Sequence, residues 1–147
     1  YINSIRFDAD ELSGQSTLSY GWNGVAWQMG NEGIEEIVIK GQKYTKVQCY
    51  IMSVQVMPDN FHAWTNLGNS IPGGQTIVMV DGVRYNNFQC HARCLEINSK
   101  YDYGWSSLVA HMQQNDRIEI SRKMYTRQQA VAMQQQATKT VDPYGTK

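Results

Sequence analysis

The sequence predicts a mainly α-helical repeat protein (an α+β repeat class) of about three helix–hairpin–helix units, with short β-hairpins stacked beside the helices. Two sets of aromatic residues recur at nearly one spacing. The first set is Trp22, Trp64 and Trp105, which lie 42 and 41 residues apart. The second is Tyr44, Tyr85 and Tyr125, which lie 41 and 40 apart. Agreement between independent markers indicates an internal repeat.

The spacing divides the chain into one solenoid domain of successive repeats. The predicted repeats are residues 20–60, residues 61–101, and residues 102–147 with the C-terminal segment. Residues 1–19 form either a partial repeat or an N-terminal arm. The first interpretation follows from residues 2–7, which align with residues 80–85 at the return of the central hairpin. Both interpretations stay open.

Each repeat begins with a short helix and ends with a longer one. In the central repeat, Trp64, Leu67 and Ile71 follow one another at spacings of three and four, which places them on one helical face. Asn60 is a suitable N-cap residue, and Pro72 is expected to end the first helix.

A β-hairpin is predicted between the two helices of each repeat. Lys40–Gly41 and Asp81–Gly82 are tight-turn dipeptides between β-prone runs, and Ser121–Arg122 occupies the same place in the third repeat. Because one unit cannot bury its own apolar face, the units are expected to stack. The stacked hairpins would form a ribbon of strands, with the three tyrosines as an aromatic ladder and the three tryptophans in the core.

The first helix of the central repeat resembles that of a tetratricopeptide repeat, through Trp64, Leu67, Gly68 and Ile71. Tyr50, Ser53 and Pro58 match the second-helix aromatic, small residue and closing proline of that family. The resemblance covers roughly residues 20–145. The period here exceeds the family's 34 residues by about seven, which the hairpin accounts for. The chain is therefore interpreted as a variant with a β-hairpin inserted between the two helices.

Composition excludes several classes of function. Thirteen basic and thirteen acidic residues cancel, so neither nucleic acid nor an anionic membrane is indicated as a partner. No apolar run reaches the roughly 18 residues of a membrane span. The chain does not begin with Met and shows no signal peptide, so its localisation stays open. An extracellular filament is compatible with a signal that was removed.

Cys90, His91 and Cys94 are the only cluster that suggests metal chemistry. A second ligand pair is missing, and Cys49 takes the place of Cys90 in the first repeat, which favours a small buried residue. Neither a nucleophile–base set nor a glycine-rich phosphate loop is present. We therefore expect no enzyme activity, no metal and no cofactor.

The resemblance implies that first helices form a concave binding face. The matching exposed positions include Trp27, His62, Thr65, Asn66, Asn69 and Tyr103. No Lys or Arg occupies them, so the family's carboxylate clamp is absent. Asn66 and Asn69 could hydrogen-bond an extended peptide. The alternative is a solvated polar face without a ligand.

Two functions follow. The first is a structural protein that self-associates head to tail into a filament; the second is an adaptor that binds a peptide or protein in the concave groove. Candidate assembly residues at the two ends are Ile2, Ile5, Phe7, Ile118, Ile120, Ala130, Val131, Met133 and Ala137. The glutamine-rich last helix would instead suit a soluble cap; its glutamines are Gln128, Gln129, Gln134, Gln135 and Gln136.

Overall fold

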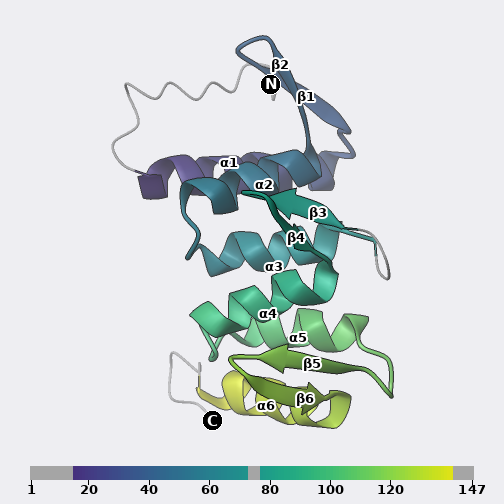
Figure 1. Ribbon diagram of the computed structural model, residues 1–147. Helices are drawn as coiled ribbons and strands as arrows, with labels where there is room; N and C mark the ends of the chain where they lie inside the picture. The colour runs from purple at the N-terminus through teal and green to yellow at the C-terminus, as the bar shows by residue number, and fades with distance from the viewer. Residues whose placement is uncertain (1–14, 73–76, 141–147) are drawn as a thin grey trace.

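The computed structural model describes residues 15–72 and 77–140 (Figure 1). Within them the chain runs three times through helix, hairpin and helix. The first unit is α1 (Gln15–Glu32), β1 (Glu36–Ile39), β2 (Gln42–Thr45) and α2 (Lys46–Val56). The second is α3 (Phe61–Ser70), β3 (Val78–Val80), β4 (Val83–Tyr85) and α4 (Asn87–Ile97). The third is α5 (Asp102–His111), β5 (Arg117–Ile120), β6 (Lys123–Thr126) and α6 (Arg127–Thr140).

The first helix begins before the predicted repeat boundary at residue 20. It starts at Gln15 and has 18 residues, whereas α3 and α5 have 10 each. Residues 2–7, predicted as half of a hairpin, lie outside the described residues. The helices of each unit pack against each other, and α2 and α4 also pack against the next unit's first helix.

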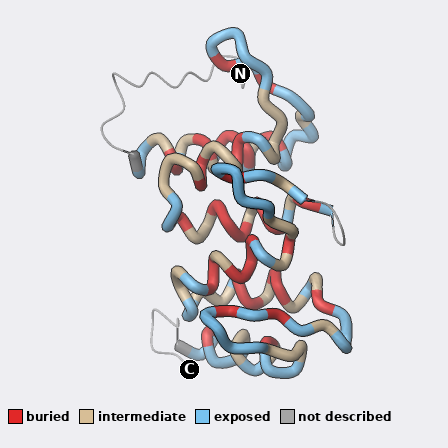
Figure 2. Tube along the Cα trace, in the orientation of Figure 1, coloured by how far each residue is buried: buried red, intermediate tan, exposed pale blue. Residues whose placement is uncertain are grey.

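The core lies between the helices, where the buried residues gather (Figure 2). Each repeat tryptophan is buried: Trp22 is 5%, Trp64 2% and Trp105 1% exposed. Each one packs against the hairpin tyrosine of its own unit, with ring centroids 4.9, 4.9 and 5.4 Å apart. The three tyrosines do not contact one another in the described part of the chain. The expected aromatic ladder is thus replaced by three separate tryptophan–tyrosine pairs.

The predicted turns are confirmed. Both central residues of each turn have positive φ: Lys40 and Gly41 at 51° and 80°, Asp81 and Gly82 at 49° and 80°. Such a pair is typical of the type I′ turn that suits a two-residue hairpin. The third turn has the same geometry at 52° and 68° without glycine, in Ser121 and Arg122.

The hairpins do not join into the expected ribbon of strands. Among the described residues the strands form three separate two-stranded antiparallel sheets. The reason is distance. Successive hairpins are separated by a pair of helices, each helix adding about 8–10 Å, whereas paired strands lie about 4.8 Å apart. Each hairpin instead turns alternate side chains toward the helices, as Ile37 and Ile39 of β1 show.

The second helices α2, α4 and α6 all begin with the same capping arrangement. Thr45 Oγ1 accepts from Gln48 N at 3.2 Å, and Gln48 Oε1 accepts from Thr45 N at 2.8 Å. Asn86 and Thr126 make the same reciprocal pair with the residue three positions later. This capping box satisfies amides that the first turn leaves free. Residues of α2, α4 and α6 can therefore be compared by their distance from the cap.

Gly68 allows α3 and α4 to approach each other closely. A methyl group at this position would lie 2.8 Å from Cε1 of His91, which is fully buried. We expect Gly68→Ala to lower the free energy of unfolding by about 1–3 kcal/mol through overpacking, as measured by urea denaturation. Gly24→Ala is the matched control, because open space surrounds its Cβ position. That change should stabilise the protein by about 0.5–1 kcal/mol; stabilisation by both changes would contradict the close approach.

Candidate functional site

The first helices α1, α3 and α5 lie side by side (Figure 1), and polar and aromatic residues of all three lie on one side of them. We call it the amide–aromatic face. Its residues are Tyr20, Asn23 and Trp27 of α1, His62, Asn66 and Asn69 of α3, and Tyr103 and Ser107 of α5. It contains five of the six positions that were assigned from the sequence to the concave face.

Hydrogen bonds of two asparagines join the three helices across this face. Asn66 Nδ2 donates to Asn23 Oδ1 of α1 at 3.0 Å. Asn69 Nδ2 donates to the Tyr103 hydroxyl at 3.2 Å and to Ser107 Oγ at 3.1 Å, both on α5. The Oδ1 atoms of Asn66 and Asn69 have no hydrogen-bond partner among residues 15–72 and 77–140. Both asparagines are thus held in place with an acceptor available.

Aromatic rings surround the amides. Trp27 is 56%, Tyr20 49% and Tyr103 48% exposed, among the most exposed large apolar side chains of the described chain. On α1, Tyr20 and Trp27 lie three and four residues from Asn23, which puts all three on one side of the helix. The Tyr20 ring is also 6.5 Å from the ring of His62. The rings therefore lie beside the amide groups, where a ligand can contact both.

His62 is fixed by a residue that the sequence did not suggest. Its Nδ1 lies 3.1 Å from the hydroxyl of Tyr101, and the two rings meet edge to face at 5.1 Å. Tyr101 occupies the N-cap position of α5 but makes no side-chain capping bond, whereas Asn60 caps α3. The sequence held one indication of this contact, because the N-cap position of α5 is occupied by an aromatic residue, Tyr101, and not by a usual capping residue.

The face carries no formal charge at neutral pH. None of its eight residues is Lys, Arg, Asp or Glu. Burial lowers the pKa of His62, so its imidazole is neutral near pH 7. Burial, with smaller contributions from Cys94, Tyr103 and Asp102, raises the pKa of Tyr101 to about 12. The chemistry offered is that of amides, hydroxyls and aromatic rings, which suits an uncharged polar ligand.

One residue expected on the face is elsewhere. Thr65 is fully buried, and its Oγ1 donates to Cys94 Sγ of α4 at 2.8 Å. The helical spacing that turns Asn66 and Asn69 outward turns Thr65 toward the second helix of its own unit. The prediction that Thr65 is exposed was therefore wrong.

The structure also places four of the nine predicted assembly residues in the interior. Ile118, Ile120, Ala130 and Ala137 are buried in one apolar cluster, at 7%, 3%, 0% and 4% exposure. They are covered because β5 lies against α4 and α6 packs on α5. Val131 and Met133 are half-buried. Ile2, Ile5 and Phe7 lie outside the described residues. The four buried side chains of β5 and α6 are therefore not a free surface, contrary to expectation.

The surface that α6 turns outward is polar. Counted from the capping residue, Gln128, Gln134 and Gln135 take the positions that Phe88, Cys94 and Leu95 hold in α4. Cys94 and Leu95 are buried and Phe88 is half-buried, whereas Gln128 and Gln135 are exposed and Gln134 half-buried. At these three positions α6 is thus more polar than α4, whereas Val131 and Ala132 stand where α4 has His91 and Ala92.

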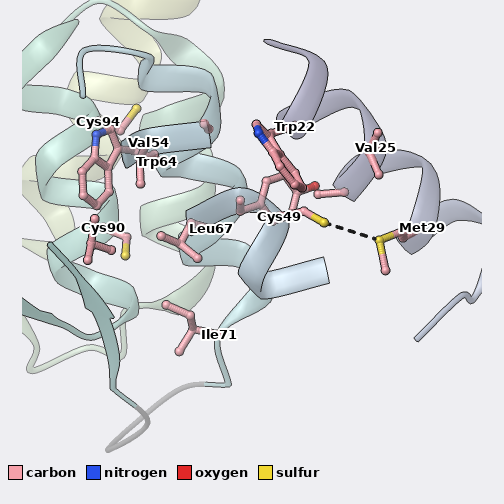
Figure 3. Packing of buried hydrophobic residues seen from close by; sticks show 14 of the residues in the cluster. Trp22, Val25, Met29, Cys49, Val54, Trp64, Leu67, Ile71, Cys90 and Cys94 are labelled. Carbon is pink, nitrogen blue, oxygen red and sulfur yellow. Dashed lines mark hydrogen bonds between the residues drawn. The ribbon is translucent and has the colours of Figure 1, made fainter. Parts of the chain in front are cut away.

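The three cysteines are buried and free. Burial raises the pKa of Cys49 and of Cys90 to about 12, and that of Cys94 to about 11. Cys49 Sγ lies 3.9 Å from the Met29 sulfur inside the core (Figure 3). At neutral pH these groups are thiols, and metal ligation needs thiolates. In the described part of the chain, no three His, Cys, Asp or Glu side chains are grouped as metal ligands.

No protein-family model, curated protein or solved structure matches the chain. The resemblance to tetratricopeptide repeats therefore depends on the residues quoted for it. A helix both long and apolar enough to cross a membrane is not found in the described ranges.

Proposed function

We propose that the protein is a non-enzymatic binding module that holds an uncharged extended segment of a partner protein on the amide–aromatic face. The observation that carries the proposal is the pair of interhelical amides, Asn66 and Asn69, fixed beside exposed aromatic rings. The resemblance of α3 to the first helix of a tetratricopeptide repeat supports the same surface.

The proposed contacts follow from the groups present. The backbone N–H groups of an extended segment can donate hydrogen bonds to Oδ1 of Asn66 and of Asn69. The exposed rings of Trp27 and Tyr103 supply apolar contact area at low entropic cost, and such residues dominate many interfaces. Because the face is uncharged, a carboxylate or ammonium group of the partner would gain no ion pair there.

Head-to-tail self-association into a filament is the second candidate. The observation in its favour is that α2 packs on α3 and α4 on α5 in the same order, so α6 of one copy could continue the pattern on α1 of the next. The exposed Gln128 and Gln135 of α6 weigh against it, because they stand where α4 has Phe88 and Leu95 and α2 has Val47 and Val54. For this reason we place the binding module first.

Trp27→Ala provides the test of the binding module. Peptides would first be selected on the intact protein from a displayed library of random decapeptides. We expect Trp27→Ala to raise the Kd of selected peptides at least tenfold, measured by fluorescence anisotropy, because it removes an exposed aromatic anchor. Met124→Ala is the control, since Met124 is 52% exposed but lies on β6, away from the face.

Equal affinity in both variants would place the binding surface elsewhere. Failure to select any peptide, together with a mass that grows with protein concentration in sedimentation, would favour the filament instead.

A further inference from the structure

A second surface lies between two hairpins, on the side of the molecule where the strands are. Strands β4 and β5 form its walls and α4 its floor, around a cavity of about 520 Å³. Figure 1 shows β4 and β5 as the facing strands of successive hairpins. We call this cavity the inter-hairpin slot.

Both walls offer free backbone groups. Strand β4 pairs only with β3, and β5 only with β6, within the described ranges. Each strand therefore turns an unpaired edge of N–H and C=O groups toward the slot. Open edges of this kind bind extended peptides by adding a strand.

The slot has arginines on both walls. Arg84 lies on β4 and Arg117 on β5, and neither has an ion-pair partner in the described part of the chain. On the floor, Arg93 is paired with Glu96 at 3.5 Å, and Glu96 Oε2 also accepts from Ser121 N at 3.4 Å. Glu119 is the remaining acidic residue of the lining. The lining has three arginines against two glutamates, so an acidic ligand is favoured.

The floor between these charges is partly apolar. Phe88 and Ala92 of α4 line it, and Val83, which is 52% exposed, lies at its edge. Successive side chains of an extended strand point to opposite sides. A bound strand could therefore place apolar side chains against Phe88 while its acidic side chains reach Arg84 and Arg117.

We propose that the inter-hairpin slot binds an extended acidic segment of a partner protein, in which acidic and apolar residues alternate. The main chain of the segment pairs with an open edge of β4 or β5. This site is separate from the amide–aromatic face and does not depend on it. It also gives the inserted hairpins a role, because they create the two edges.

The test uses an octapeptide that alternates glutamate and valine, blocked at both ends, and a matched octapeptide of lysine and valine. Binding to the intact protein would be followed by isothermal titration calorimetry at low ionic strength. We expect the glutamate peptide to bind and the lysine peptide to bind at least tenfold more weakly. Reversing both wall charges, with Arg84→Glu and Arg117→Glu, should invert this preference.

Arg122→Glu is the control, because Arg122 is an exposed arginine in the turn after β5 and outside the slot lining. It should keep the preference for the glutamate peptide, as should Trp27→Ala on the other face. Urea denaturation would show that the charge-reversed protein is folded. Three results would overturn the proposal. They are equal binding of both peptides, an unchanged preference after charge reversal, and self-association of the intact chain that the reversal abolishes.

Discussion

Replacing Trp64 with alanine is expected to lower the free energy of unfolding by about 3–5 kcal/mol, the range for losing a large buried aromatic side chain. Trp64 is 2% exposed, and its ring packs 4.9 Å from the ring of Tyr85. Its Nε1 donates to the carbonyl of Pro58 at 2.8 Å. The side chain therefore connects α3, the hairpin of its unit and the loop from the preceding unit.

The controls separate burial from residue type. Trp27→Ala removes the same side chain from an exposed position and should change stability by less than about 0.5 kcal/mol. Trp64→Phe keeps most of the apolar contact but removes the hydrogen bond, so its cost should be intermediate. Urea denaturation of the three variants gives the comparison. Equal destabilisation by Trp64→Ala and Trp27→Ala would contradict the assignment of their faces.

The elements of this fold could be predicted from the sequence because their signals are local. Tight-turn dipeptides such as Asp81–Gly82 favour positive φ wherever they stand between β-prone runs. The spacing of Trp64, Leu67 and Ile71 identifies the buried side of α3 without knowledge of its neighbours. The third turn was predicted at Ser121–Arg122 only from its place in the repeat, since neither residue is glycine.

What could not be predicted depends on contacts between distant residues. Ser53 illustrates this, because its Oγ donates to the backbone carbonyl of Ser19 at 2.7 Å in the fully buried junction of α1 and α2. Asn60 Nδ2 donates to Ser19 Oγ at 3.0 Å in the same junction, while Asn60 also caps α3. The sequence identifies the cap, but not the serines that satisfy its remaining donors. Likewise, the sequence shows that Ile118 is apolar, but not that other residues of the same chain bury it.

The candidate site was likewise predicted in its positions but not in its contacts between helices. The resemblance to tetratricopeptide repeats placed Asn66 and Asn69 on the exposed side of α3. It could not show that they donate to α1 and α5 respectively, because those bonds depend on how the helices align. The burial of Thr65 depends on the close packing of α4 against the same helix, which a single helix pattern does not contain.

The second large effect is acid destabilisation through His91. Its side chain is fully buried, and neither ring nitrogen has a hydrogen-bond partner in the described structure. It contacts Gly68 of α3 and stacks on His111 of α5 at 5.1 Å. Burial, with a smaller contribution from His111, lowers the pKa of His91 from 6.5 to about 3. The folded protein therefore holds this imidazole in its neutral form.

The sign of the pH dependence follows from proton counting. Between pH 6.5 and about 3, the unfolded chain binds a proton at His91 that the folded chain does not bind. The stability contributed by the neutral form is thus fully present above pH 6.5 and is lost as the pH falls. Each pH unit within this window should cost up to about 1.4 kcal/mol.

Urea denaturation at pH 7.5, 6.5, 5.5 and 4.5 would measure the slope. His91→Leu removes the titrating group and should make the slope shallower by about one proton, while the intact protein loses stability steadily below pH 6.5. The lowered pKa of His62 contributes in the same direction, so His62→Gln is the matched control and should reduce the slope less. If His91→Leu and the intact protein lose stability in parallel between pH 6.5 and 4.5, His91 is not held neutral by its burial.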